Sequence, residues 1–230
     1  MAAFFGCTGL TVPTVISGDD IEIEPYAFYG CTSLVRGNDV ANSMKPIYKV
    51  GQSAFENCTS LKLISNHAQY IENNAYKNSG IEFANLDSIK SMGTDVFKDC
   101  TSLTRLEITG GTISSIPNIA SGCVNLQRVV FGPSVTSISS FASGTPFPAK
   151  PDGGYTSVTG EWDSYHGAYM AVLVLNSTSK VYCPWSSLPS GAVLLLRVPS
   201  EIREAYRSDS RWRAICPRVS TAGTVYDYIS

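Results

Sequence analysis

The chain has 230 residues, of which 43% are hydrophobic and only 16% are charged, with a formal net charge of -2 at pH 7. This composition is too apolar for an intrinsically disordered chain, and it lacks the basic excess typical of nucleic-acid-binding proteins. No apolar run approaches the roughly 20 residues that a membrane-spanning helix needs. We therefore expect a folded protein with no nucleic-acid partner and no membrane span.

One short phrase is repeated along the first 145 residues. Residues 3–10, 27–34, 54–61 and 96–103 are near copies that share an aromatic residue, a cysteine and a leucine, and residues 75–81, 119–126 and 141–145 are weaker copies. With the cysteine position as the marker, the copies are spaced 21 to 27 residues apart. A period in this range indicates a leucine-rich-repeat-like solenoid, in which each repeat forms one rung.

Each repeat also predicts two short strands. An apolar residue precedes the marker by seven or eight positions, as in Ile23 and Ile71, and alternating residues follow it. In residues 103–108 this alternation places Leu106 and Ile108 inside and Arg105 and Glu107 outside. A single repeat buries too little apolar surface to be stable, so the repeats must stack.

The phrase Ala-Phe-x-x-Cys-Thr-Ser-Leu resembles the BspA-type leucine-rich repeat family of bacterial surface proteins, over residues 1 to about 145. The resemblance implies an α/β fold, a right-handed leucine-rich-repeat solenoid (horseshoe) with a C-terminal strand-helix cap. Residues 195–212 are similar to the element that closes many arrays of this family. We expect Ser200 to be the N-cap of its helix, and Ile202, Tyr206, Trp212 and Ile215 to cover the open end of the solenoid.

The whole chain is therefore expected to form one solenoid domain in three parts. Residues 1–145 are the repeat array, which starts within a repeat; residues 146–193 are an irregular insertion with a degenerate terminal repeat; residues 194–230 are the cap and tail. Within the insertion, Trp162, Tyr165 and His166 either form a binding loop or pack on the open end of the solenoid, and we favour packing.

Five of the seven cysteines (Cys7, Cys31, Cys58, Cys100 and Cys123) occupy the marker position. Markers on successive rungs form a column whose Cβ vectors are parallel, which disfavours disulfides, and a linear column cannot supply a tetrahedral zinc site. We expect buried free thiols and no metal site. A disulfide between Cys183 and Cys216, outside the column, stays open.

No catalytic constellation is found along the chain. It has two histidines, His67 and His166, and lacks the motifs of serine hydrolases, zinc proteases and phosphate-binding loops. We expect neither enzymatic activity nor a cofactor. The acidic run at residues 19–24 alternates, so its carboxylates are expected to form a solvated edge rather than a calcium site.

A solenoid offers an extended concave sheet for binding. The outward strand positions predict this ligand-binding face: Arg36, Asn38, Leu63, Ser65, Phe83, Asn85, Arg105, Glu107, Arg128 and Val130. An apolar patch at Leu63 and Phe83 beside two arginines has the residue types enriched at interface hot spots. The alternative is ordinary variation on a face without function.

These patterns together favour a non-catalytic recognition module for a protein or glycan ligand. The resemblance implies a secreted or cell-surface, adhesin-like protein that recognises host or cell-surface macromolecules. The first residues carry no secretion signal, so localisation rests on the resemblance alone. Two other hypotheses stay open: a glycan-binding accessory module that uses the aromatic loop at 146–169, and a structural spacer that presents another domain. Ligand identity, full-length architecture and oligomeric state do not follow from the sequence.

Overall fold

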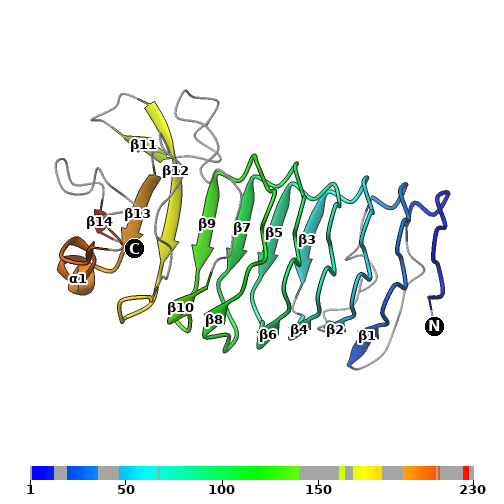
Figure 1. Cartoon of the computed structure of the whole chain (residues 1–230), viewed down its shortest axis with the longest axis horizontal. Coiled ribbons are helices and arrows are strands. Elements are labelled where there is room, and N and C mark those ends of the chain that lie inside the picture. The colour runs from blue at the N-terminus through cyan, green and yellow to red at the C-terminus, as the bar shows by residue number, and fades with distance from the viewer. Residues whose placement is uncertain are drawn as a thin grey trace.

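The protein is a β-solenoid whose rungs stack along one axis (Figure 1). The computed structural model describes residues 2–12, 20–35, 47–66, 68–139, 161–163, 168–182, 194–210, 212 and 225–227. Its strands are β1 (Ile21–Ile23), β2 (Ile47–Val50), β3 (Leu63–Asn66), β4 (Tyr70–Ile71), β5 (Phe83–Leu86), β6 (Ser91–Met92), β7 (Arg105–Ile108), β8 (Ser115–Ile116), β9 (Arg128–Phe131), β10 (Ser137–Ile138), β11 (Glu161–Asp163), β12 (Ala168–Leu175), β13 (Leu194–Val198) and β14 (Val225–Asp227).

The strands form two rows of parallel neighbours. The long sheet has the order β3-β5-β7-β9-β12-β13-β14, with β11 antiparallel beside β12, and the short sheet has the order β1-β2-β4-β6. The pair β8 and β10 is also parallel. Along the long sheet, the register joins Leu63 to Phe83, Phe83 to Arg105 and Arg105 to Arg128. The two strands predicted for each repeat are therefore confirmed for the repeats with markers at residues 58, 79, 100 and 123, whose strands are all described.

The segments between the two strands of a rung are turns, not helices. The residue before the marker has a positive φ in six repeats: Gly6, Gly30, Asn57, Asn78, Asp99 and Gly122. A second left-handed residue lies four positions earlier in several of them, as at Ser53 and Asn74. Left-handed residues so closely spaced cannot belong to an α-helix. The helices that an α/β horseshoe would place here are therefore absent from the described rungs.

The turns are joined to one another by backbone hydrogen bonds. The amide of Phe28 donates to the carbonyl of Ala54 at 2.8 Å, and the amide of Phe55 donates to the carbonyl of Ala75 at 2.7 Å. The residues before the marker do the same, since the amide of Asn57 donates to the carbonyl of Lys77 at 2.9 Å. Each turn thus satisfies part of its backbone through the next rung, as buried polar groups require.

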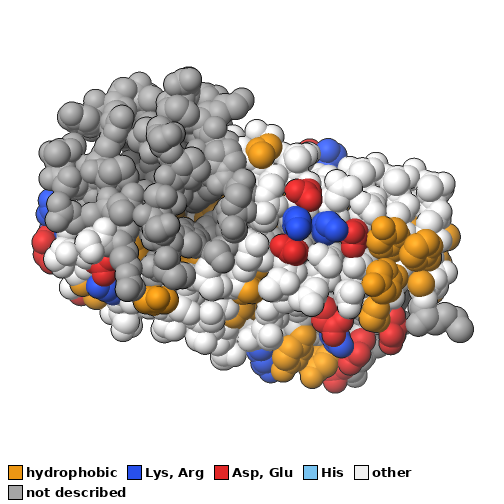
Figure 2. Space-filling model, viewed as in Figure 1, with side chains coloured by type: hydrophobic (Ala, Val, Ile, Leu, Met, Phe, Trp, Pro, Cys, Tyr) orange, Lys and Arg blue, Asp and Glu red, His pale blue; other side chains and the backbone are white. Residues whose placement is uncertain are grey.

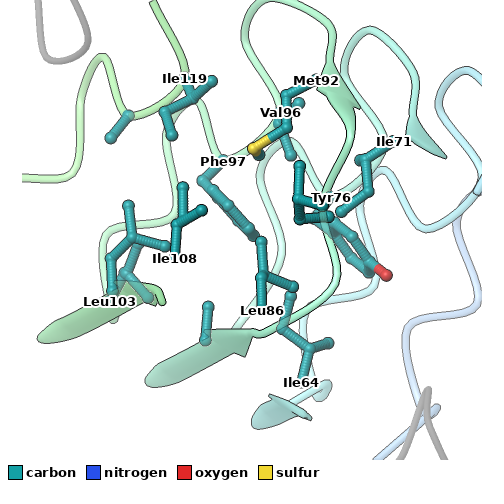
Figure 3. Packing of buried hydrophobic residues seen from close by; sticks show 14 of the residues in the cluster. Ile64, Ile71, Tyr76, Leu86, Met92, Val96, Phe97, Leu103, Ile108 and Ile119 are labelled. Carbon is teal, nitrogen blue, oxygen red and sulfur yellow. The ribbon is translucent and has the colours of Figure 1, made fainter. Parts of the chain in front are cut away.

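An aromatic ladder runs through the interior beside these turns. The rings of Phe4, Phe28, Phe55, Tyr76 and Phe97 stack in that order with centroids 5.1 to 5.7 Å apart and interplanar angles of 12° or less. Figure 3 shows Tyr76 and Phe97 packed among aliphatic side chains that point inward from the strands. The core is continuous along the array, because the buried cluster extends from Ile23 to Trp212.

The marker cysteines lie beside the ladder, and their thiols are free. Cys31, Cys58, Cys100 and Cys123 are buried, and each Sγ donates to the carbonyl of the ladder residue one rung earlier at 3.0 to 3.1 Å. Buried free thiols are thus confirmed for these four. The prediction is wrong for Cys7, which is exposed because no described rung covers its outer side. Cys183 and Cys216 lie outside the described residues.

Two short helical segments follow β13: a 3-10 helix, η2 (Ser200–Ile202), and α1 (Arg203–Arg207). The prediction that Ser200 caps the helix is wrong, since Pro199 is the N-cap of η2 and no side chain caps either segment. Tyr206 and Trp212 are buried. The backbone amide of Val181 donates to the Tyr206 hydroxyl, and the Trp212 indole N–H donates to the Val181 carbonyl, both at 2.9 Å.

These contacts support a closing role for residues 194–212, which stays a prediction. Ile215 lies outside the described residues, as do the boundaries predicted near residues 145 and 193. Among the described helices, neither is long and apolar enough to cross a membrane.

Candidate binding surface

The outer face of the long sheet carries the side chains that the sequence predicted as a ligand-binding face. By register, Phe83, Arg105 and Arg128 follow one another across β5, β7 and β9, and Asn85 and Glu107 follow one another beside them. We call these five residues the central patch. All five are half-buried. The sheet therefore brings the middle of the predicted site together.

The central patch is held by one charge network. The Arg105 guanidinium donates to Glu107 Oε1 through Nε at 2.7 Å and lies 2.6 Å from it through a terminal nitrogen, and Arg128 Nε lies 4.0 Å from the same oxygen. The side chain of Glu107 is only 13% exposed, compared with 37% for Arg105. The predicted arginine stripe is thus a network of two cations around one carboxylate, with a net charge of about +1.

The Arg105 guanidinium also lies over the face of an aromatic ring, which holds it in position. Its Cζ lies 4.9 Å from the centroid of the Phe83 ring, within the range of a cation–π contact. Asn85 contributes a polar atom without a hydrogen-bond partner, since its Oδ1 is buried and accepts no hydrogen bond among the described residues. The patch therefore combines a rigid guanidinium, a ring and an unused amide acceptor.

Charges of both signs continue around the patch. Lys62 and Glu82, which precede β3 and β5, form an exposed ion pair at 2.8 Å. Figure 2 likewise shows acidic and basic side chains intermixed on the face that it presents. A partner would therefore meet a mixed, nearly balanced charge pattern rather than a basic stripe.

The open part of this face ends at β9. Val130 was expected to be an outward, accessible position, but it is only 7% exposed. Val172 and Val174, which continue the outer face on β12, are buried as well, at 0% and 3%. Both faces of the described half of β12, residues 172–175, are thus covered, since its inward residues Leu173 and Leu175 are buried too.

For the remaining predicted site residues, the structure describes either no part of the residue or only its backbone. Residues 36, 38, 67, 165 and 166 are not described, which covers Arg36, Asn38, His67, Tyr165 and His166. Leu63 and Ser65 belong to β3 and Trp162 to β11, but their side chains are not described. The aromatic loop at 146–169 therefore stays a prediction.

A hollow that the sequence did not predict lies on the outer face of the short sheet. It has a volume of about 450 Å³ and is lined by Glu22, Tyr48, Lys49, Tyr70, Ile71, Glu72, Ser91, Met92 and Gly93. Only the long spacing of 27 residues between the markers at 31 and 58 gave a sign of irregularity in this rung.

The described residues offer little for covalent or metal chemistry. Burial raises the pKa of Cys58 to about 12 and that of Cys100 to about 11, so these thiols stay protonated and are poor nucleophiles at neutral pH. Within the described ranges, no group of three or more histidine, cysteine, aspartate or glutamate side chains is placed to hold a metal ion.

Comparison with known proteins agrees with this architecture. A crystal structure of a leucine-rich repeat protein from Bacteroides ovatus superimposes with a TM-score of 0.51 at 16% sequence identity, covering 86% of this chain. The chain spans 57% of the length of that protein, so the likeness concerns the fold alone. No curated protein matches the chain.

The sequence pattern of one repeat family matches more than half of the chain. The BspA type Leucine rich repeat region is found in 6 copies across residues 21–143, the stretch that contains the aromatic ladder from Phe28 onward and all of the central patch. The chain therefore belongs to the BspA-type leucine-rich repeat family.

Proposed function

We propose that this protein is a non-catalytic, adhesin-like module that binds a protein partner through the central patch at a bacterial surface. Leucine-rich repeats of this kind are typical of protein-interaction modules, and BspA-type repeats are typical of bacterial surface and secreted proteins. The observation that carries the proposal is the fixed guanidinium of Arg105, held between the Phe83 ring and the Glu107 carboxylate.

Such a guanidinium suits recognition because its position is set before the partner arrives. Ordering a free side chain on binding costs about 0.5–1.5 kcal/mol, and most of that cost is avoided here. Arginine and aromatic residues are also those enriched at interface hot spots. A partner carboxylate or backbone carbonyl could be held by the donors of Arg105 and Arg128.

The size of the expected effect follows from the network. Reversing Arg105 and Arg128 to glutamate would place three carboxylates together on β7 and β9 and repel an acidic partner group. A hot spot of this kind contributes at least about 2 kcal/mol, which corresponds to a loss of about 30-fold in affinity.

The test begins with the whole chain immobilised and probed with a panel of purified extracellular-matrix and host-surface proteins. The best protein hit is then measured by surface plasmon resonance against the Arg105→Glu, Arg128→Glu variant. The matched control is Lys77→Glu, Lys98→Glu, which changes the net charge equally in the turns, away from the long sheet.

Loss of binding in the first variant alone supports the proposal, provided both variants unfold at the parent temperature. Equal affinity in parent and first variant would remove the central patch as the binding site. A panel without any protein hit would count against the adhesin-like role.

A further inference from the structure

The hollow on the short sheet has a different character from the central patch. It opens to solvent on the outer face of β2, β4 and β6, and combines two tyrosine rings with two carboxylates and one ammonium group. A volume of about 450 Å³ lies within the range of small-ligand sites, which place a few convergent polar groups around apolar surface.

A β-bulge creates this arrangement. Ile21 pairs with Ile47, but the next residue, Glu22, pairs with Lys49, so Tyr48 is the extra residue of β2. Because Ile47 and Val50 are both buried, Tyr48 and Lys49 point together to the outer face instead of alternating. Bulges re-aim side chains in this way and are over-represented next to functional sites.

The re-aimed tyrosine meets a second ring on the next rung. The centroids of Tyr48 and Tyr70 are 5.1 Å apart, with an angle of 58° between the ring planes. The rings touch each other, which leaves no room for a cation between them as in an aromatic cage. They instead form a half-buried, angled apolar surface with hydroxyl groups at its edge.

Charged groups border these rings on both sides. Lys49 Nζ lies 2.6 Å from Glu72 Oε1, and Glu72 Oε2 accepts the backbone amide of Gln52 at 2.9 Å, so this carboxylate is fully engaged. Glu22 lies in register beside Lys49 and forms no ion pair within the described ranges. The lining therefore carries a net charge of about -1, which disfavours an anionic ligand.

Electrostatics raise the pKa of two donors of the hollow, Lys49 and Tyr48. Hydrogen bonding to Glu72, with added attraction from Glu22 and Glu24, raises the pKa of Lys49. Repulsion from Tyr70, with added repulsion from Glu22 and Asp20, raises the pKa of the Tyr48 hydroxyl. At neutral pH the hollow thus offers an ammonium and phenol donors beside a free carboxylate acceptor.

From this geometry we infer that the hollow is a binding site for a neutral sugar. A pyranose ring presents an apolar C–H face, which suits an aromatic surface, and a rim of hydroxyls that both donate and accept hydrogen bonds. Glu22, Lys49 and the tyrosine hydroxyls supply the complementary partners. The site is on the other sheet and takes another ligand class than the proposed protein-binding patch, so it goes beyond that function.

The test uses the whole chain on an array of neutral oligosaccharides built from glucose, galactose, mannose and N-acetylhexosamines, printed beside their sialylated and sulfated counterparts. The strongest neutral hit is then titrated by isothermal calorimetry. Removal of one stacking ring in Tyr70→Ala should weaken binding at least about tenfold. Glu22→Gln, which keeps the shape of the side chain, should weaken it by a smaller factor.

Two controls make the outcome specific. Tyr182→Ala removes a tyrosine that is 53% exposed outside the hollow and should leave sugar binding within about twofold. The Arg105→Glu, Arg128→Glu variant should also leave it unchanged, so failure of either proposal is distinguishable from failure of the other.

Several results would overturn the inference. These are an array without neutral hits, a preference for sialylated or sulfated glycans, or an affinity of both Tyr70→Ala and Glu22→Gln equal to that of the parent protein. Binding of a lysine-rich peptide that Tyr70→Ala abolishes, in the absence of sugar binding, would reassign the hollow to peptide recognition. Thermal midpoints of all variants verify that each is folded.

Discussion

The aromatic ladder predicts that one ring in its middle is worth a large part of the stability of the array. Phe55 is 1% exposed and is stacked at 5.1 Å on Phe28 and at 5.3 Å on Tyr76, with angles of 4° and 1°. Phe55→Ala removes the buried ring and leaves a cavity, at a cost of about 3–5 kcal/mol. The loss of two stacked pairs puts the expected value at the upper end, about 5 kcal/mol.

This loss is large compared with the total free energy of unfolding of the domain. Domains of this size are stable by about 5–15 kcal/mol, and in a solenoid each rung depends on its neighbours. We therefore expect the rungs on the two sides of Phe55 to unfold separately, so that a single unfolding transition becomes two. Urea unfolding followed by far-ultraviolet circular dichroism measures both the free energy and the number of transitions.

Phe5→Ala is the matched control. Phe5 is 57% exposed and stacks on one ring, Tyr29, at 4.9 Å, so its removal should cost about 1 kcal/mol or less. A loss below about 2 kcal/mol in Phe55→Ala, or a loss equal to that of the control, would refute the claim that the ladder joins the rungs energetically.

Three further predictions concern the thiols and the C-terminal segment. A thiol reagent at pH 8 should label Cys7 and spare Cys58 and Cys100, as peptide mass spectrometry would detect; equal labelling would contradict their burial. Because burial raises the pKa of Cys58 from 9.0 to about 12, and that of Cys100 to about 11, the unfolded state loses protons first, and the free energy of unfolding should fall as pH rises from about 9 to about 12. The loss of stability is measured as the fall of the thermal midpoint with rising pH. Replacing both cysteines by alanine should make this fall less steep, and an unchanged slope would show that the two thiols do not cause it. Trp212→Ala should lower the thermal midpoint by about 10 °C, since it removes a buried ring and its hydrogen bond to the core, whereas the exposed Arg207→Ala should not; equal midpoints would argue against a closing role.

The rungs and their strands were predictable because their signal is local and repeated. The spacing of the marker cysteines and the alternation at Leu106 and Ile108 identify inward positions without any knowledge of the partner strand. The absence of helices from the turns of the described rungs was also predictable from the sequence. Glycine, asparagine or aspartate directly before the marker is typical of a left-handed residue, and a resemblance to α/β folds outweighed that signal.

The details of both surfaces depend on contacts between rungs and were not predictable. The bulge at Tyr48 exists only in relation to the register of β1, which no single repeat specifies. The pairing of Arg105 with Glu107 was foreseeable from their shared face, but its effect on Arg128 needed the register of β9. The burial of Val130 results from long-range packing, which leaves no mark in the repeat itself.

The backbone hydrogen bonds donated by the ladder residues Phe4, Phe28, Phe55, Tyr76 and Phe97 all run toward the next rung, and this gives that row of peptide units an electrical polarity. The peptide unit between Ala27 and Phe28 accepts from the amide of Phe4 through its carbonyl and donates through its amide to Ala54, so its dipole lies along the solenoid axis. Equivalent units on successive rungs add up, as in a helix, with the positive end toward the later rungs. A further rung, whether a repeat or a second molecule, can therefore continue this ladder only head to tail, because a head-to-head contact would set carbonyl against carbonyl. Self-association through the turns would lead to an open filament rather than to a closed twofold dimer.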